Sequence, residues 1–215
     1  MTSSAPMGGT TALPPKPKRG RPPGVNSEQT RARLVSSARV LFAERGYDGA
    51  GIAELVSVAG VTPPVLYHHF QSKAGLYAAA MTEVYDIILD RFATATATED
   101  RFPDKLHAML LAAAELHEED PTISMFVNSV PAQLTAYPEL HAIAPQMGRV
   151  QRFLLQLAKA SPDLAGRSPT RVAQAAAVVL SGMARISTGL TSAAEHRRYI
   201  ASVRLLIDGE LFSSS

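Results

Sequence analysis

The sequence predicts an all-α protein, and two observations support this prediction. Apolar residues recur at the three- and four-residue spacing of one helix face through most of the chain, whereas β-branched residues form no alternating runs typical of strands. Helix-start signals divide this pattern, for instance at Asp120-Pro121 and Ser168-Pro169, where a capping residue precedes a proline. We therefore expect a group of short N-terminal helices and a larger helical body behind them.

The first element, residues 1–24, is predicted to be a disordered arm, because it contains ten Pro or Gly residues and no apolar periodicity. Within it, Arg19-Gly20-Arg21-Pro22 resembles the core of the AT-hook. The AT-hook is an extended peptide whose two arginines enter the narrow minor groove of A·T-rich DNA. The alternative is a solvated basic tail that aids solubility.

The first helix is expected to begin at Ser27, a suitable N-cap, and to stop at Gly46. Its apolar face consists of Leu34, Ala38, Leu41 and Phe42. After a short turn, a second apolar set predicts another helix that ends at Gly60 and contains Ile52, Leu55, Val56 and Ala59. The tight turn at Gly60 and the helix after it suit a helix-turn-helix motif over residues 25–72.

The third helix is expected from Thr62 to Phe70, because Thr62 is a good N-cap and prolines are tolerated in the first turn. Leu66 and Phe70 lie four residues apart and can pack inward together. This packing leaves Thr62, Tyr67 and His68 pointing outward. Ser72 is predicted to cap the next helix.

The remaining residues, 73–215, are predicted to form an all-helical body. We expect its helices at 73–95, 103–118, 121–136, 138–160, 169–189 and 193–212. Ser192 and Glu195 fit a capping box at the start of the last helix. Pro131 should kink or end the third of these helices.

Composition narrows the function classes. Of the 215 residues, 46% are hydrophobic and none is Cys, which excludes disulfides, thiolate metal sites and cysteine nucleophiles. No apolar run reaches the roughly 18 residues of a membrane-spanning helix, and the N-terminus lacks the pattern of a signal peptide. We expect a cytoplasmic protein with no metal, no cofactor and no membrane partner.

The formal net charge of +2 is unevenly distributed. Residues 1–75 contain nine basic and four acidic side chains, whereas residues 76–215 contain twelve and fifteen. A basic N-terminal part on a mildly acidic body favours a polyanion as the partner of that end.

A longer pattern is specific to one family. Gly46-Tyr47-Asp48, Ile52, Ala59-Gly60-Val61-Thr62, Leu66-Tyr67-His68-His69-Phe70, Ser72-Lys73 and Leu76 resemble, at matching spacing, the tetracycline-repressor (TetR) family of bacterial regulators. The resemblance implies a helix-turn-helix domain that binds a palindromic double-stranded operator. It also implies a body that dimerises and binds a small-molecule effector, here expected to release a repressor from DNA. Activation from a differently placed operator is the alternative.

The resemblance assigns roles by position. Thr62, Tyr67 and Lys73 match positions that contact DNA phosphates, and Pro63, Pro64 and His68 match positions that face bases or the groove wall. One departure is Ala50, where the family commonly has a Ser or Thr that caps the second helix. Alanine at an N-cap costs about 1 kcal/mol, unless Asp48 takes over the cap.

The last two helices are the expected dimer interface of the homodimer. The stripes concerned are Val172, Ala176, Val179 and Met183 on one helix and Tyr199, Val203 and Leu206 on the other. Two such helices from each subunit can form a four-helix interface. The alternative is that both stripes are intramolecular core.

An effector pocket is expected among the middle helices, for a hydrophobic or aromatic molecule. Candidate residues are His107, Met109, Met125, Phe126, Met147 and Phe153, with His117, Asn128 and Gln133 as further polar contacts. Methionine suits an adaptable apolar cavity, although a stripe of Met and Phe at helical spacing is more often plain core.

Two other classes compete with a regulator. An enzyme is disfavoured because the chain has no Gly-rich phosphate loop, nucleophile elbow or H-E-x-x-H spacing. An architectural DNA binder of low specificity is suggested by the Arg-Gly-Arg segment, and its specificity ratio would distinguish it.

Overall fold

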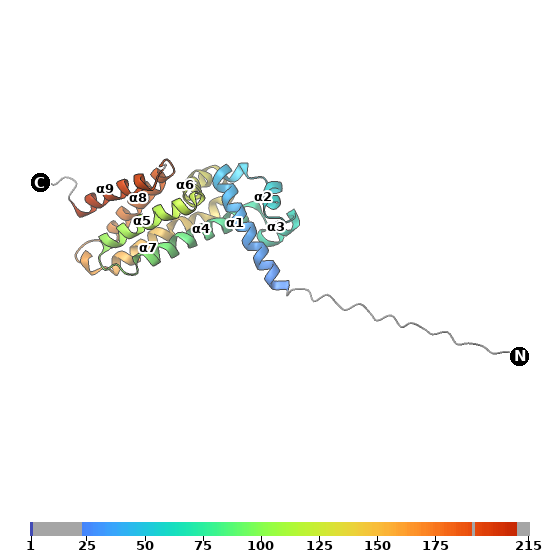
Figure 1. Cartoon of the computed structure of the whole chain (residues 1–215), viewed down its shortest axis with the longest axis horizontal. Coiled ribbons are helices and arrows are strands. Elements are labelled where there is room, and N and C mark those ends of the chain that lie inside the picture. Colours follow the sequence, from blue (N-terminus) through green and yellow to red (C-terminus); the bar gives the residue numbers. More distant parts are fainter. Residues whose placement is uncertain (2–22, 191, 210–215) are drawn as a thin grey trace.

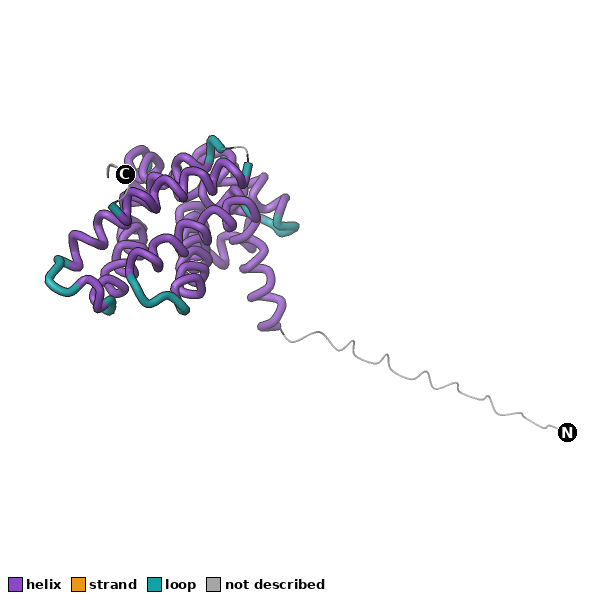
Figure 2. The backbone as a smooth tube through the Cα atoms, turned by 60° about the vertical axis from the view of Figure 1, so that its left-hand side comes forward, coloured by secondary structure: helices purple, strands orange, loops and turns teal. Residues whose placement is uncertain are grey.

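The computed structural model of the chain describes Met1 and residues 23–190 and 192–209. Every regular element in these ranges is helical, which confirms the all-α prediction (Figures 1 and 2). The order is α1 (Pro23–Gly49), α2 (Ile52–Val58), α3 (Pro63–Phe70), α4 (Lys73–Thr96), α5 (Phe102–Glu119), α6 (Pro121–Ala136), the 3-10 segment η1 (Pro138–Met147), α7 (Gly148–Lys159), η2 (Pro162–Leu164), α8 (Pro169–Ser187) and α9 (Ala193–Asp208).

The helices form an elongated molecule with the short helices α2 and α3 at one end and α9 toward the other (Figure 1). Two clusters of buried side chains hold it together. The first joins α1–α3 and the start of α4 to α6. Within it, Tyr77 lies edge-on to Phe42 and stacks on Phe126, at centroid distances of 4.9 and 5.1 Å. The second surrounds Met109 and includes Phe92 near the end of α4. Because α4 is packed into both clusters, it fixes the position of α1–α3, here called the head, relative to the helices of the body.

The helix α1 departs from its predicted start but not from its predicted break. It begins at Pro23, so Ser27 lies exposed inside the helix and the expected N-cap is wrong. A proline suits this position because its missing N–H is not needed in the first turn. Gly46 has φ 70° and interrupts the helix as predicted, since this left-handed conformation favours glycine. The predicted arm lies, apart from Met1, Pro23 and Gly24, outside the described residues.

The predicted loss of a side-chain cap on α2 is confirmed, but the N-cap residue is Gly51 rather than Ala50. The N-cap is Gly51, whose carbonyl accepts hydrogen bonds from the backbone N–H groups of Glu54 and Leu55 at 3.1 and 3.0 Å. Ala50 is completely buried one residue earlier. Glycine at an N-cap costs only a few tenths of a kcal/mol relative to serine or threonine, so this start needs no substitute from Asp48.

The body helices confirm most predicted starts. Asp120 accepts a hydrogen bond from the backbone N–H of Thr122 at 3.0 Å, and Ser168 and Ser192 accept bonds from the third residue after them. The predicted helix 138–160 is only half right: α7 confirms its second part, but its first part is the 3-10 segment η1, where Pro145 cannot donate an α-helical hydrogen bond. The helix α6 continues through Pro131 to Ala136.

The end of α9 is earlier than predicted. Its last residue is Asp208, and Gly209 follows in the left-handed conformation with φ 77°, which typically ends a helix. The helix α8 similarly ends at Ser187 rather than at 189.

Candidate DNA-binding helix and small-molecule cavity

The helix α3 has one buried and one exposed face. Leu66 and Phe70 are 0% and 7% exposed, so they anchor the helix in the first core cluster. On the other side, Thr62, Tyr67 and His68 are exposed, with Tyr67 at 48%. The Thr62 hydroxyl makes no capping hydrogen bond within the helix. These polar groups are therefore free to meet a partner.

The turn before α3 is rigid. The N–H of Val61 donates to the carbonyl of Val56 at 2.9 Å, and the N–H of Gly60 donates to Ser57 at 3.1 Å. With Gly60 at φ 65°, these bonds form a Schellman motif at the end of α2. The motif fixes the angle at which α3 leaves α2. The prolines 63 and 64 are exposed in its first turn.

Lys73 lies at the start of α4 and already has partners inside the protein. Its ammonium donates to the carbonyl oxygen of Asp48 at 3.2 Å and lies 4.7 Å from the centre of the Tyr47 ring. Burial lowers the pKa of Lys73, against the opposing effect of Asp48. One of its three N–H donors is used, which leaves others for a phosphate.

A further cation beside α3 was missed by the sequence reasoning. The guanidinium of Arg31, on α1, lies 5.4 Å from the centre of the Phe70 ring and is exposed. Burial, then the neighbouring His68 and Arg31, lower the pKa of His69. The signal was available, because Arg31 lies one turn before Leu34 on the same face of α1. The arginines 19 and 21 of the AT-hook-like segment lie outside the described residues.

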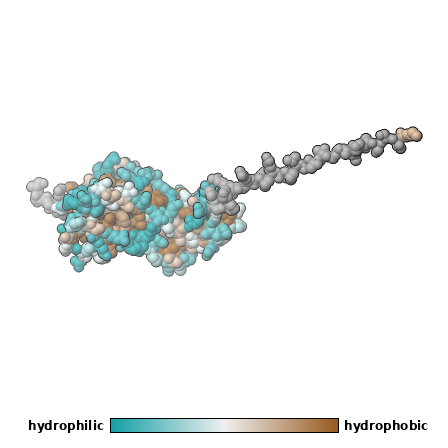
Figure 3. All heavy atoms as spheres, turned by 90° about the horizontal axis from the view of Figure 1, so that it is seen from below, coloured by the Kyte–Doolittle hydropathy of each residue, from teal (hydrophilic) through white to brown (hydrophobic). Residues whose placement is uncertain are grey.

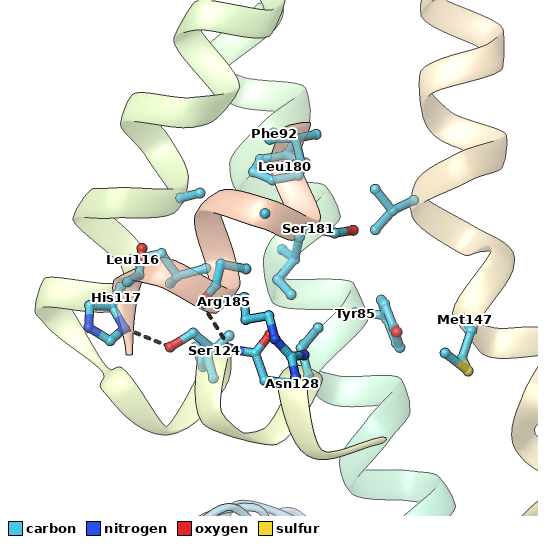
Figure 4. A pocket seen from close by; sticks show the side chains of 18 of the residues that line it. Tyr85, Phe92, Leu116, His117, Ser124, Asn128, Met147, Leu180, Ser181 and Arg185 are labelled. Atoms are coloured by element: carbon cyan, nitrogen blue, oxygen red, sulfur yellow. Dashed lines mark hydrogen bonds between the residues drawn. The ribbon is translucent and has the colours of Figure 1, made fainter. Parts of the chain in front are cut away.

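The body contains a cavity of about 410 Å³, partly open to the surface, between α4, α5, α6, α7 and α8 (Figure 4). Its apolar lining comes from Ile88, Phe92, Ala113, Leu116, Ile123, Val127, Pro131, Met147, Val150, Leu180 and Ala184. Its polar lining comes from Tyr85, His117, Ser124, Asn128, Ser181, Arg185 and Ser187. Pockets that take small organic ligands have this size and this mostly apolar character.

Hydrogen bonds tie the polar side of the cavity to the fold. His117 Nδ1 and Ser124 Oγ are 2.6 Å apart, and Asn128 donates from Nδ2 to the carbonyl of Ala184 at 2.9 Å. Burial, and then the neighbouring His196, lower the pKa of His117. The cavity wall therefore joins α5 to α6 and α6 to α8.

The expected pocket residues are only partly at this cavity. Met147, His117 and Asn128 line it. The structure places the others elsewhere: Met109 and Phe126 are completely buried in the core, and His107, Met125, Phe153 and Gln133 are half-buried away from the cavity. Sequence periodicity cannot separate a cavity wall from core, because both are apolar faces of the same helices.

The residues of the predicted dimer interface are partly buried within the monomer and partly exposed. Ala176 and Met183 are buried within the monomer, Val172, Val179 and Val203 are half-buried, and Tyr199 and Leu206 are 46% and 49% exposed. Other apolar side chains are exposed instead, namely Val178 at 71%, Ile186 at 41% and Leu205 at 42%. Figure 3 shows apolar patches among the polar surface of the body. The outward apolar face of α8 is thus Val178 and Ile186, rather than Ala176 and Met183.

Two absences concern the described residues only. Among them, no helix is both long and apolar enough to cross a membrane. No group of three or more His, Asp or Glu side chains in the described ranges could hold a metal ion.

Comparison with known proteins matches the head most closely. The family model described as bacterial regulatory proteins, tetR family, matches residues 34–80. The transcriptional activator FasR of Mycolicibacterium smegmatis is 37% identical over 95 residues, which are 43% of this chain and 42% of FasR. The transcriptional repressor BdcR of Escherichia coli is 38% identical over 66 residues, 31% of this chain and 34% of BdcR. The chain thus spans less than half the length of these curated relatives.

The similarity in fold extends further along the chain. A crystal structure of a TetR-family transcriptional regulator from Pectobacterium atrosepticum is 25% identical, with a TM-score of 0.63, over 89% of this chain and 98% of that one. The resemblance predicted from residues 34 to 76 is confirmed. Residues 34–80 thus match the tetR family of bacterial regulatory proteins, and along most of its length the chain is similar in fold to a TetR-family transcriptional regulator.

Proposed function

We propose that the chain is a sequence-specific DNA-binding transcriptional regulator that acts as a homodimer and releases its operator when a small molecule binds. The observation that carries this proposal is the two-sided helix α3, anchored by Leu66 and Phe70 and offering Thr62, Tyr67 and His68 outward. A recognition helix held by a tight turn in this way enters the major groove. Phosphate contacts from Thr62, Tyr67 and Lys73 would position it, and Pro63, Pro64 and His68 would face the groove.

Dimerisation is proposed through the outward faces of α8 and α9. Val178, Ile186, Tyr199, Leu205 and Leu206 expose large apolar surfaces there. Exposed apolar side chains on α8 and α9 favour a protein partner, and a second copy of the chain would give a two-fold symmetric DNA-binding protein. A palindromic operator with half-sites about one DNA turn apart, or a multiple of it, matches such a dimer.

The effector would act through α6, which lines the cavity and contacts α1 near both of its ends. At the first end, Asp120 Oδ2 lies 2.8 Å from Arg39 Nη2. At the other, Gln133 Oε1 accepts a hydrogen bond from the backbone N–H of Tyr47 at 3.1 Å. A ligand that displaces α6 must therefore also move α1, and α1 packs against α2 and α4 in the head.

The decisive experiment is selection of bound DNA from a random pool by the full chain, followed by binding to the selected site and to random duplex. We expect a palindrome bound at least a thousandfold more tightly than random DNA, as specific regulators typically are. Equal affinity for both would instead support an architectural DNA binder. Placing the operator over or upstream of a promoter in a reporter then separates repression from activation.

The proposal leaves no catalytic role for the chain. The relatives are named as regulators, and the polar residues of the cavity make contacts that tie helices together. Turnover of any molecule that the cavity binds, retained after removal of residues 1–72, would contradict it.

A further inference from the structure

We propose that the cavity binds an amphipathic monoanion, a molecule with an apolar body and one terminal carboxylate, and that Arg185 receives the carboxylate. This inference rests on the proposed function only in treating the cavity as the effector site. It goes further because it names the chemistry of the ligand and the residue that selects it.

The charge of the lining points to an anion. Arg185 is the only Lys, Arg, Asp or Glu among the residues that line the cavity. The pKa of His117 is lowered by burial and by His196, so its ring is neutral at pH 7 and adds no charge. A cationic ligand would therefore meet one positive charge and no carboxylate, whereas an anion would meet a counter-charge.

The guanidinium of Arg185 is available for this role. Some body arginines are paired with carboxylates, for instance Arg91 with Glu119 at 2.6 Å and Arg204 with Asp104 at 2.8 Å. The Arg185 side chain is exposed and, like that of Arg167, makes no hydrogen bond or ion pair within the described part of the chain. A planar guanidinium can bind a carboxylate through two parallel hydrogen bonds.

The cavity has a polar end, where Arg185 lies, and an apolar end. Figure 4 shows Arg185 beside Asn128 and Ser124, whereas Phe92 and Leu180 lie at the opposite end of the cavity. One N–H of the Asn128 amide donates to the carbonyl of Ala184, which leaves its second N–H for a ligand. A molecule with its carboxylate at Arg185 would thus place its apolar body against Phe92 and Leu180.

The groups around this end hold α6 and α8 together. Asn128 belongs to α6, and both Ala184 and Arg185 belong to α8. A carboxylate bound between Arg185 and Asn128 would contact both helices. The ligand would then act at the same helix, α6, that connects the cavity to Arg39 and Tyr47 of α1.

The test compares three probes with one chain length and different head groups: decanoate, 1-decanol and decylammonium, each below its micelle concentration. Binding to the full chain is measured by calorimetry at pH 7.5. We expect decanoate to bind at least tenfold more tightly than decanol, and decylammonium to bind most weakly. Equal affinities for the three probes, tighter binding of decylammonium, or no binding of decanoate would overturn the proposal.

The variant Arg185→Gln should lose at least tenfold in affinity for decanoate and keep its affinity for decanol. Arg167→Gln is the matched control, because Arg167 is an exposed arginine in the turn before α8 and does not line the cavity. A loss of decanol binding equal to that of decanoate would mean a disturbed cavity and would overturn the assignment to Arg185. So would an Arg185→Gln dimer that dissociates while decanoate binding stays unchanged, because Arg185 would then belong to the dimer interface.

Operator binding without ligand separates this inference from the proposed function. A chain that binds a palindrome but shows no selectivity for decanoate would refute the ligand class alone. A chain that binds decanoate through Arg185 but prefers no DNA sequence would refute the regulator and leave the anion site standing.

Discussion

Arg39 of α1 forms an ion pair with Asp120 at the start of α6, with Nη2 and Oδ2 2.8 Å apart. The arginine is 8% exposed, and its Nε also lies 3.7 Å from Oε2 of Glu83 on α4. Burial raises the pKa of Glu83, against the opposing effect of Arg39. Burial would also raise the pKa of Asp120, but hydrogen bonds from Thr122 and Arg39 outweigh it and hold that pKa below its usual value. One guanidinium thus joins three helices of the head and body.

Replacing this arginine should destabilise the fold strongly. Arg39→Met leaves Asp120 and Glu83 partly buried without their counter-charge, and we expect a loss of about 2–3 kcal/mol in the free energy of unfolding. Urea unfolding measures it. Arg45→Met is the control, because Arg45 pairs with Glu54 at 2.5 Å on an exposed surface, with half of its own side chain exposed. That change should cost less than about 1 kcal/mol, and equal losses in the two variants would contradict the role given to Arg39.

The dimer interface can be tested without disturbing the monomer. Val178 and Leu206 are 71% and 49% exposed, so Val178→Glu with Leu206→Glu should leave each subunit folded. In a dimer the same changes bury four charges in an apolar interface, at a cost of several kcal/mol. Sedimentation velocity should show a folded monomer, with circular dichroism unchanged. A variant that remains dimeric at micromolar concentration would place the interface elsewhere.

Stability should depend on pH through His117. Burial and His196 hold its pKa below 6.5 in the folded protein, with Glu118 acting in the opposite direction. The unfolded chain then binds more protons below about pH 6.5, so this contribution to stability is complete above that pH and is lost as the pH falls through the folded pKa. We expect His117→Gln to flatten the decrease in melting temperature between pH 7.5 and 5.5. Parallel curves for the variant and the unaltered chain would exclude this origin.

Contacts with DNA phosphates should be independent of sequence. Tyr67→Phe removes an exposed hydroxyl, and Lys73→Gln removes a charge, so both should weaken binding to the operator and to random duplex by a similar factor. Lys73→Gln should also lower the slope of log affinity against log salt by about one. The Lys73 ammonium donates a hydrogen bond to the carbonyl of Asp48 and lies over the ring of Tyr47. A melting curve must therefore show that the variant remains folded. Unchanged affinity in a folded variant would remove that residue from the interface.

The N-terminal segment should read the DNA flanking each half-site. Arg19 and Arg21 are expected to enter a narrow minor groove, whereas G·C pairs place an amino group on its floor. Deleting residues 1–22 should therefore weaken binding more on operators with A·T-rich flanks than on those with G·C-rich flanks, while α3 keeps its core preference. The affinities of the full chain and the deletion variant are measured on four duplexes that combine two flanking sequences with two core operator sequences. Equal losses on both flanks would leave only an electrostatic tether.

The sequence alone determined the elements whose causes are local. The two prolines after Thr62 mark the start of α3, although the Thr62 side chain makes no capping hydrogen bond, and the spacing of Leu66 and Phe70 sets its buried face. Capping residues such as Asp120 acted within three residues and marked the body helices correctly. The family resemblance, carried by residues 34–76, depended on the same local pattern.

Tertiary structure decided what depends on packing between distant segments. Phe126 and Val127 are neighbours on α6, yet Phe126 is core and Val127 lines the cavity. On α8, Met183 packs inside the subunit while Val178 stays exposed. An apolar helix face shows that burial must occur but does not show against which partner, because the partner is fixed by how other helices approach. Arg39 and Asp120 are likewise joined only by the fold, since no periodicity or capping rule connects residues 81 positions apart in sequence.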